Sequence, residues 1–125
     1  MIKNRAVLFF TVILLILSGC VTVESLRKLP EERLKYYSGF YAENLYRQEI
    51  INRHPEWSEK IKQAILKGSV SMGMTKQQAK AAWGEPYKIN RTVTQSGIHE
   101  QWVYNQVGAL SFLYFDNDIL TSWQN

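Results

Sequence analysis

The sequence predicts an α+β fold in which helices come first and a small antiparallel β-meander packs on them. Up to Gly84, apolar residues recur at the spacing of helices, whereas beyond Pro86 they alternate with a period of two. Turn signals follow one another closely after Pro86, and connections this short make neighbouring strands antiparallel. Helices grouped ahead of strands are typical of the α+β class.

The first element is a secretory signal over residues 1–19. Lys3 and Arg5 form a short positive start, an apolar run of 12 residues follows at 6–17, and small residues lead to Cys20. A spanning helix needs about 20 residues. The sequence therefore predicts a signal peptide and not a retained transmembrane anchor.

The segment Leu17-Ser18-Gly19-Cys20 resembles the lipobox of bacterial lipoproteins. The resemblance implies cleavage before Cys20, lipidation of this residue (a palmitate-type acyl group among the chains), and attachment to a membrane. Two acyl chains are enough for stable attachment. Val21 stands where inner-membrane retention signals place Asp, which implies the periplasmic face of the outer membrane. An ordinary signal peptide with a coincidental cysteine is the alternative.

Composition limits what the mature chain can be. Cys20 is the sole cysteine, so no disulfide can form within the folded part. Removing residues 1–19 lowers the net charge from +4 to +2, because Lys3 and Arg5 leave 13 basic against 11 acidic residues. This balance does not favour a nucleic-acid partner. The remaining length suits one small domain.

Residues 20–29 are short, polar and unpatterned, and we expect a lipidated tether there. Residues 30–68 are expected to form two helices. The first begins at Pro30 and ends at 52–55, and the second begins at Pro55 and ends at Gly68. The first helix has its inward stripe at Leu34, Tyr37, Tyr41 and Leu45, and the second at Trp57, Ile61, Ala64 and Ile65.

A third helix has the clearest boundaries. Thr75 and Gln78 form a capping box, and Gly84 with Pro86 ends the helix. Ala79, Ala82 and Trp83 are expected to face inward. Four strands follow, at 87–94, 98–104, 109–115 and 119–123. Trp102 and Tyr104 share one face of the second strand.

Residues 69–125 resemble the SmpA/OmlA (BamE-like) domain of outer-membrane assembly lipoproteins. The matching segments, in order, are Gly73-Met74-Thr75, Trp83-Gly84-Glu85-Pro86, Trp102-Val103-Tyr104 and Leu113-Tyr114-Phe115-Asp116-Asn117. The resemblance implies this fold and a part in outer-membrane or envelope protein assembly. The two helices within residues 30–68 depart from the family pattern. The architecture also resembles that of proteinaceous β-lactamase inhibitors.

The sequence carries no pattern typical of an enzyme, a metal site or a cofactor site. His54 lies at a helix break and His99 on a strand, and no spacing places them together. Asp116 and Asp118 flank a turn, without the further oxygen ligands of a calcium loop. We therefore expect a protein that is not an enzyme and has no cofactor.

Aromatic residues are the better candidates for a binding surface. Tyr36 and Tyr46 fall outside the inward stripe of the first helix, and Phe40 widens that stripe. Tyrosine is enriched at interfaces because it buries a large area with little loss of entropy. The alternative is that these side chains belong to the core. A second candidate is a set of cations, for which a solvated face is the favoured interpretation: Lys60, Lys62, Lys67, Lys76, Lys80, Lys88 and Arg91.

Together these observations predict a non-catalytic outer-membrane lipoprotein whose small domain binds another envelope protein. The alternative is an inhibitor or sensor of a periplasmic enzyme, and a small hydrolase of wall components ranks last. The sequence does not identify the partner, the oligomeric state, or whether residues 30–68 pack on the domain that follows.

Overall fold

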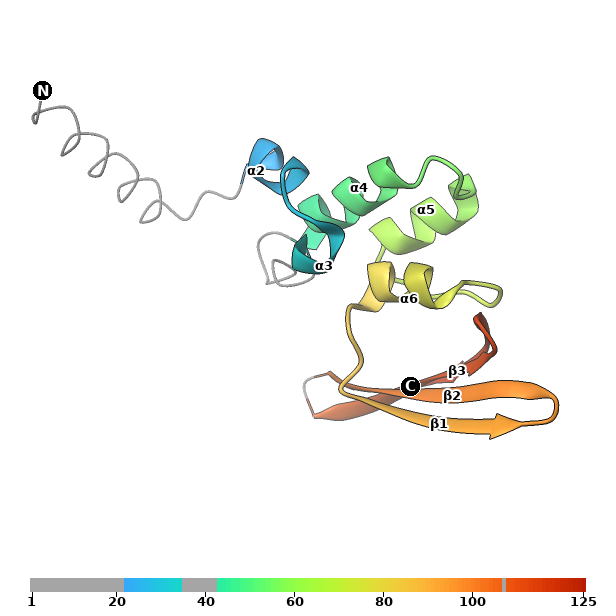
Figure 1. Cartoon of the computed structure of the whole chain (residues 1–125). Coiled ribbons are helices and arrows are strands. Elements are labelled where there is room, and N and C mark those ends of the chain that lie inside the picture. Colours follow the sequence, from blue (N-terminus) through green and yellow to red (C-terminus); the bar gives the residue numbers. More distant parts are fainter. Residues whose placement is uncertain (1–21, 35–42, 107) are drawn as a thin grey trace, which may run out of the picture.

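The computed structural model describes residues 22–34, 43–106 and 108–125 and has the expected α+β architecture (Figure 1). The helices precede a four-stranded antiparallel sheet with the strand order β1-β2-β3-β4. In chain order the elements are α2 (Val23–Arg27), α3 (Glu31–Leu34), α4 (Glu43–Arg53), α5 (Glu59–Leu66), α6 (Lys76–Trp83), β1 (Lys88–Thr94), β2 (Gly97–Gln106), β3 (Ala109–Asp116) and β4 (Ile119–Gln124).

The segment expected to be an unpatterned tether instead contains α2, so this prediction is wrong for residues 22–29. The Thr22 side chain caps the helix by accepting a hydrogen bond from the Ser25 N–H. Leu26 is only 1% exposed. The Arg53 guanidinium donates to the carbonyl oxygens of Leu26 and Leu29, at 3.2 and 2.9 Å, and fastens this segment to the end of α4.

The expected helix from Pro30 to position 51 corresponds to α3 and α4, and residues 35–42 between them lie outside the described residues. Helix α4 ends at Arg53, as the Asn52-to-Pro55 stop signal predicted. Its buried face differs from the expected stripe. Leu45 is only half-buried, and the side chains that enter the core are Tyr46, Ile50 and Ile51.

Helix α5 (Glu59–Leu66) begins four residues later than its signal at Pro55 predicted. Ser58 is the N-cap, and its hydroxyl accepts a hydrogen bond from the Ile61 N–H. Trp57 lies ahead of the helix, where its ring stacks on His54 at 4.2 Å between centroids. The serine cap therefore outcompetes the proline as the helix start, because proline presets a backbone angle but satisfies no free N–H.

The capping box of α6 is present as predicted, and Gly84 with φ of 77° ends the helix. The four strands also agree with their predicted positions to within two residues at each end. Trp102 pairs with Leu113 across β2 and β3, and both are buried. Trp102 and Tyr104 therefore lie on the helix-facing side of the sheet, as expected.

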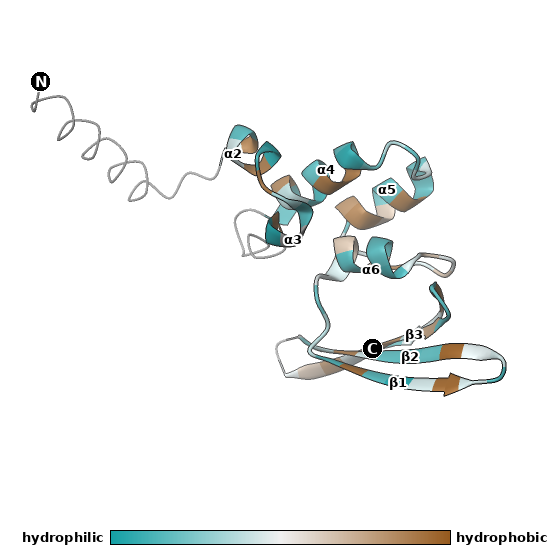
Figure 2. Ribbon diagram, viewed as in Figure 1, coloured by the Kyte–Doolittle hydropathy of each residue, from teal (hydrophilic) through white to brown (hydrophobic). Residues whose placement is uncertain are grey.

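Helix α6 lies over one face of the sheet, and α4 and α5 stack on its far side (Figure 1). Lys80 of α6 lies over the Trp102 ring, and Trp83 meets Tyr104 edge-on at 5.3 Å. Apolar bands on α4 and α5 mark this packing in Figure 2. One continuous cluster runs from Leu26 to Leu120, so the helical region packs on the domain that follows and shares its core.

Candidate functional site

The two edges of the sheet differ in how their backbone groups are used. The start of the β4 edge is covered by the segment that leads into α6. Gly73 N–H donates to the Leu120 carbonyl, Leu120 N–H donates to the Met74 carbonyl, and Lys76 N–H donates to the Asp118 carbonyl, at 2.8–3.1 Å. Thr75 and Ile119 also form a β-bridge. The chain itself therefore closes this edge at its start, up to Leu120.

The β1 edge is open among the described residues. All seven side chains of β1 are exposed, and Val93 is 69% exposed. The strand runs along the lower border of the sheet in Figure 1. Its residues take part in no backbone hydrogen bond that the described residues offer beyond β2. An exposed edge strand of this length is a template for pairing with another chain.

The pairing pattern shows which backbone groups face this open edge. The Ile98 carbonyl and N–H are both used by Asn117, toward β3. Ile98 lies opposite Val93, so the backbone N–H and C=O of Val93 form no hydrogen bond with β2. Because backbone direction alternates along an antiparallel ladder, Ile89, Arg91 and Val93 direct their N–H and C=O groups outward.

Every second side chain of β1 lies on the side of the sheet that faces the helices. Ile89, Arg91 and Val93 share the helix-facing side, because their partners on β2 are Trp102, Glu100 and Ile98. Tyr87, just before the strand, is 78% exposed. In this row the cation Arg91 therefore stands between the apolar Ile89 and Val93, along an edge that no described element covers.

Glu100 is the carboxylate that pairs with Arg91 of β1, but several groups share it. Lys76 Nζ lies 3.1 Å from its carboxylate, Trp102 Nε1 donates to it at 2.8 Å, and Arg91 Nε lies at 3.8 Å. Burial pushes the pKa of Glu100 upward, but the hydrogen bonds from Trp102 and Lys76 outweigh it, so that the pKa is lowered. Arg91 is thus only loosely paired.

On the outer face of the sheet, the structure brings together a serine, a histidine and a carboxylate. His99 Nδ1 lies 2.6 Å from Asp116 Oδ1, and its Nε2 lies 3.2 Å from Ser96 Oγ and 3.1 Å from Thr94 Oγ1. The order of contacts is that of a serine hydrolase. Sequence reasoning missed it, because the β2–β3 register that pairs His99 with Asp116 is not visible in spacing.

The surroundings of this cluster fit hydrolysis poorly. The Ser96 N–H is bound to Thr94 Oγ1 at 3.2 Å, so this backbone donor is not free to stabilise an oxyanion. The His99 and Asp116 side chains are 40% and 56% exposed, so the cluster is open to water. A shallow depression of about 310 Å³ lies beside it, with Asn90, Gln101 and Tyr114 on its wall.

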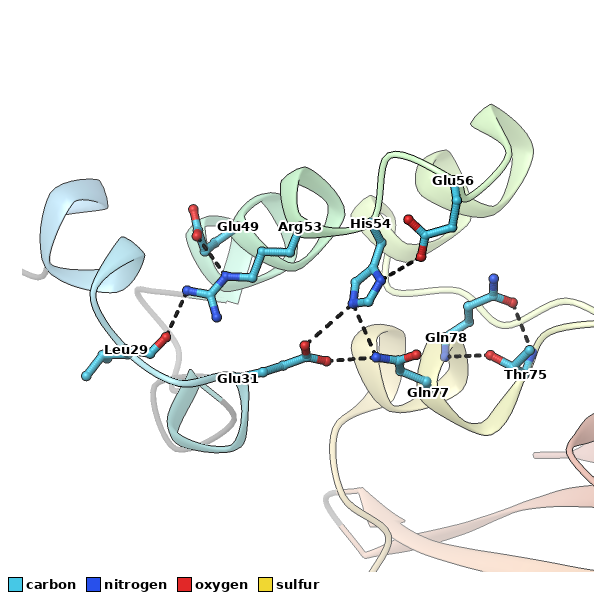
Figure 3. A network of polar contacts seen from close by, with 9 residues as sticks. All are labelled: Leu29, Glu31, Glu49, Arg53, His54, Glu56, Thr75, Gln77 and Gln78. Atoms are coloured by element: carbon cyan, nitrogen blue, oxygen red, sulfur yellow. Dashed lines mark hydrogen bonds and ion pairs between the residues drawn. The ribbon is translucent and has the colours of Figure 1, made fainter.

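His54 lies directly after α4, at the helix break that the sequence predicted. Its side chain is only 16% exposed and joins three parts of the helical layer (Figure 3). Nδ1 lies 2.8 Å from Glu56, while Nε2 lies 3.5 Å from Glu31 and 3.2 Å from the Gln77 amide. A hydrogen bond from its own backbone N–H lowers the pKa of Glu56, and the contact to His54 lowers it further.

Of the three aromatic residues expected to bind a partner, only Tyr46 lies in the described residues. It is 6% exposed, so the expectation that it points outward is wrong. Burial raises the pKa of Tyr46, and the Glu31 and Glu85 carboxylates raise it further. Its ring helps to line a depression of about 240 Å³ between α4 and α6. Tyr36 and Phe40 lie outside the described residues.

Cys20 and residues 1–19 also lie outside the described residues. Within the described part, no helix has the length and apolar character needed to span a membrane. That part also holds no cluster of three or more histidine, cysteine or acidic residues suited to a metal ion.

Comparisons with known proteins give no match: no family model, no curated protein and no solved structure resembles the chain closely enough. The interpretation of the site therefore rests on its own geometry. Two features stand out in that geometry, the open β1 edge and the His99 cluster on the outer face.

Proposed function

We propose that the protein is a non-catalytic, SmpA/OmlA-like lipoprotein of the outer membrane that binds another envelope protein through β1. The lipobox supports the anchor at Cys20 and the periplasmic location. The observation that carries the binding role is the open β1 edge, with outward backbone groups at Ile89, Arg91 and Val93. A part in envelope protein assembly follows from the family resemblance.

Strand addition explains how such an edge binds. An extended segment gains main-chain hydrogen bonds from the edge, and side-chain contacts to alternate residues provide specificity. The exposed Tyr87, Ile89 and Val93 offer apolar area beside the backbone groups. The start of β4 cannot act in this way, because the backbone groups of Asp118 and Leu120 already bond to residues 73–76.

Site-specific photo-crosslinking in intact cells tests this proposal. A photoreactive residue at Val93 should capture an envelope protein. The matched control is Met72, which is similarly exposed at 65% but lies beside the closed β4 edge. Capture of the same proteins from both positions, or no capture from Val93, would contradict binding through β1.

The anchor has its own test. A Cys20→Ser variant should leave the membrane fraction and lose the mass of the attached acyl chains. Retention of this variant in the outer membrane would contradict the lipid anchor. The wild-type chain, fractionated in parallel, provides the reference.

The same crosslinking distinguishes the alternative, an inhibitor or sensor of a periplasmic enzyme. Capture of one soluble periplasmic enzyme from Val93, in place of a membrane-associated protein, would favour the alternative. The two functions share the surface and differ only in the partner.

A second candidate function, a small hydrolase of wall components, is favoured by the contacts among Ser96, His99 and Asp116. The non-catalytic proposal predicts that purified protein shows no turnover of peptidoglycan above that of a His99→Ala variant. Turnover that disappears in both His99→Ala and Ser96→Ala would establish the hydrolase.

A further inference from the structure

The charge on β1 has a single sign. Lys88 and Arg91 are its charged residues, and the strand carries no carboxylate. Lys88 forms no ion pair with any described residue, and Arg91 is held only at 3.8 Å by a Glu100 that Lys76 and Trp102 already engage. Both cations remain available to a partner at the open edge.

This charge argues against a second copy of the chain as the partner. Neighbouring strands in a sheet lie about 4.8 Å apart. Two β1 strands would bring together Lys88 and Arg91 from each copy, with no anion on either strand to offset them. Like charges across a strand pair are destabilising, whereas a segment with carboxylates is attracted to the same edge.

We propose that β1 binds an acidic, extended protein segment that adds as a fifth, antiparallel strand, with carboxylates beside Lys88 and Arg91. This inference rests on the proposed function and specifies the partner. Antiparallel addition continues the pattern of the sheet and is slightly the more stable ladder.

The register defines the motif of the partner. Lys88 and Arg91 are three residues apart and therefore lie on opposite faces, while Ile89 and Val93 share the helix-facing side with Arg91. The partner should thus carry two acidic residues three apart, with apolar residues opposite Ile89 and Val93. The segment Ser-Val-Thr-Glu-Thr-Val-Glu satisfies this order when it runs antiparallel from Thr94 to Lys88.

Binding of this peptide, labelled with a fluorophore, is measured by anisotropy on the mature full-length protein in detergent. The expected affinity is about tenfold higher than for Ser-Val-Thr-Lys-Thr-Val-Lys, and it falls as salt is raised. N-methylation of the central Glu should also abolish binding, because it removes a main-chain donor. Equal binding of the acidic and basic peptides would overturn the charge argument.

Two pairs of variants separate backbone from side-chain effects. Val93→Pro removes an outward N–H, which an edge strand tolerates, and should abolish binding. Val93→Ala keeps the N–H and should weaken it less. Lys88→Glu should reverse the preference at the last peptide position, so that Lys there binds better than Glu. Equal affinities in Val93→Pro and Val93→Ala would exclude strand addition.

The peptide and crosslinking experiments test separate claims, so a negative result in one leaves the other claim standing. If no peptide binds while Val93 still captures an envelope protein, the acidic-strand inference is overturned and the proposed function stands. In that case the β1 cations serve only to discourage edge-to-edge self-association. If the acidic peptide binds and Val93 captures nothing in cells, the chemistry of the edge is upheld and the envelope role is overturned.

Discussion

The two edges of the sheet are built from similar strands but treated in opposite ways. At β4 the chain folds back, and residues 73–76 bond to Asp118 and Leu120, so that the first part of this edge is covered. At β1 the outward backbone groups and all seven side chains face solvent. Folded proteins usually cover or blunt such edges. The contrast shows that the chain covers part of one edge with its own backbone and leaves the other open. At the open edge only the charges of Lys88 and Arg91 discourage pairing with other chains.

Hydrogen exchange should show the largest difference between the edges. The Leu120 N–H is bonded to the Met74 carbonyl on a closed edge, so its opening free energy should approach that of global unfolding, about 5–15 kcal/mol. The outward N–H groups of Arg91 and Val93 should exchange with almost no protection. Amide-resolved exchange by NMR measures both, and strong protection at Val93 in the isolated protein would show that its edge is already covered.

Truncating side chains should separate the edges next. Leu120 is 1% exposed, so Leu120→Ala should lower the free energy of unfolding by about 2–5 kcal/mol. Val93→Ala, at an exposed position, should change it by less than about 0.5 kcal/mol. Urea denaturation followed by far-UV circular dichroism measures both. Similar losses for the two variants would mean that β1 is packed and not free.

The cap that joins the closed edge to α6 should contribute less. Thr75 holds the Gln78 N–H at 3.2 Å and bridges to Ile119, so Thr75→Ala should cost about 1 kcal/mol. Thr92→Ala, on the open strand, is the matched control and should be close to neutral. A thermal melt compares the two, and an unchanged midpoint for Thr75→Ala would contradict the role of the cap.

The smallest effect concerns pH. The pKa of Glu100 is lowered in the folded protein, so its ionised form stabilises the fold at neutral pH. This contribution should be lost as pH falls from the ordinary glutamate range through the folded-state pKa. Glu100→Gln should therefore flatten the acid limb of the stability curve. The control is Glu24→Gln, because the Glu24 carboxylate is exposed and lies 3.7 Å from an equally exposed Arg27. A steeper acid limb in Glu100→Gln would contradict the direction of the shift.

Sequence signals succeeded where the cause of structure is local. Helix α6 follows from a capping box and a Gly-x-Pro stop, and the strands follow from alternation between turn residues. They failed where the cause lies elsewhere in the fold. Five residues are too few for periodicity to reveal α2, whose Leu26 is buried because Arg53 fastens it.

The site divides in the same way. The open β1 edge was not predicted, because edge position depends on strand order in the sheet. Tyr46 was assigned to the surface from a stripe that omitted Ile50, four residues away on the same face of α4. His99 and Asp116 meet only through the register of β2 and β3, which lie 17 positions apart in sequence at this point.

The docking of α2 has a mechanical consequence for an anchored protein. Two residues separate Cys20 from Val23, the first residue of α2, a span of about 10 Å at full extension. With the proposed lipid on Cys20, only a very short linker would join the membrane to the fold. The segment that contains α2 is held to α4 by the hydrogen bond from Arg53 to the Leu29 carbonyl. The sheet lies at the opposite end of the molecule from α2 (Figure 1). Its distance from the bilayer would then vary little. Inserting a flexible stretch before Thr22 would let this distance vary more. It would thereby lower the effective concentration of β1 at a partner held at one height.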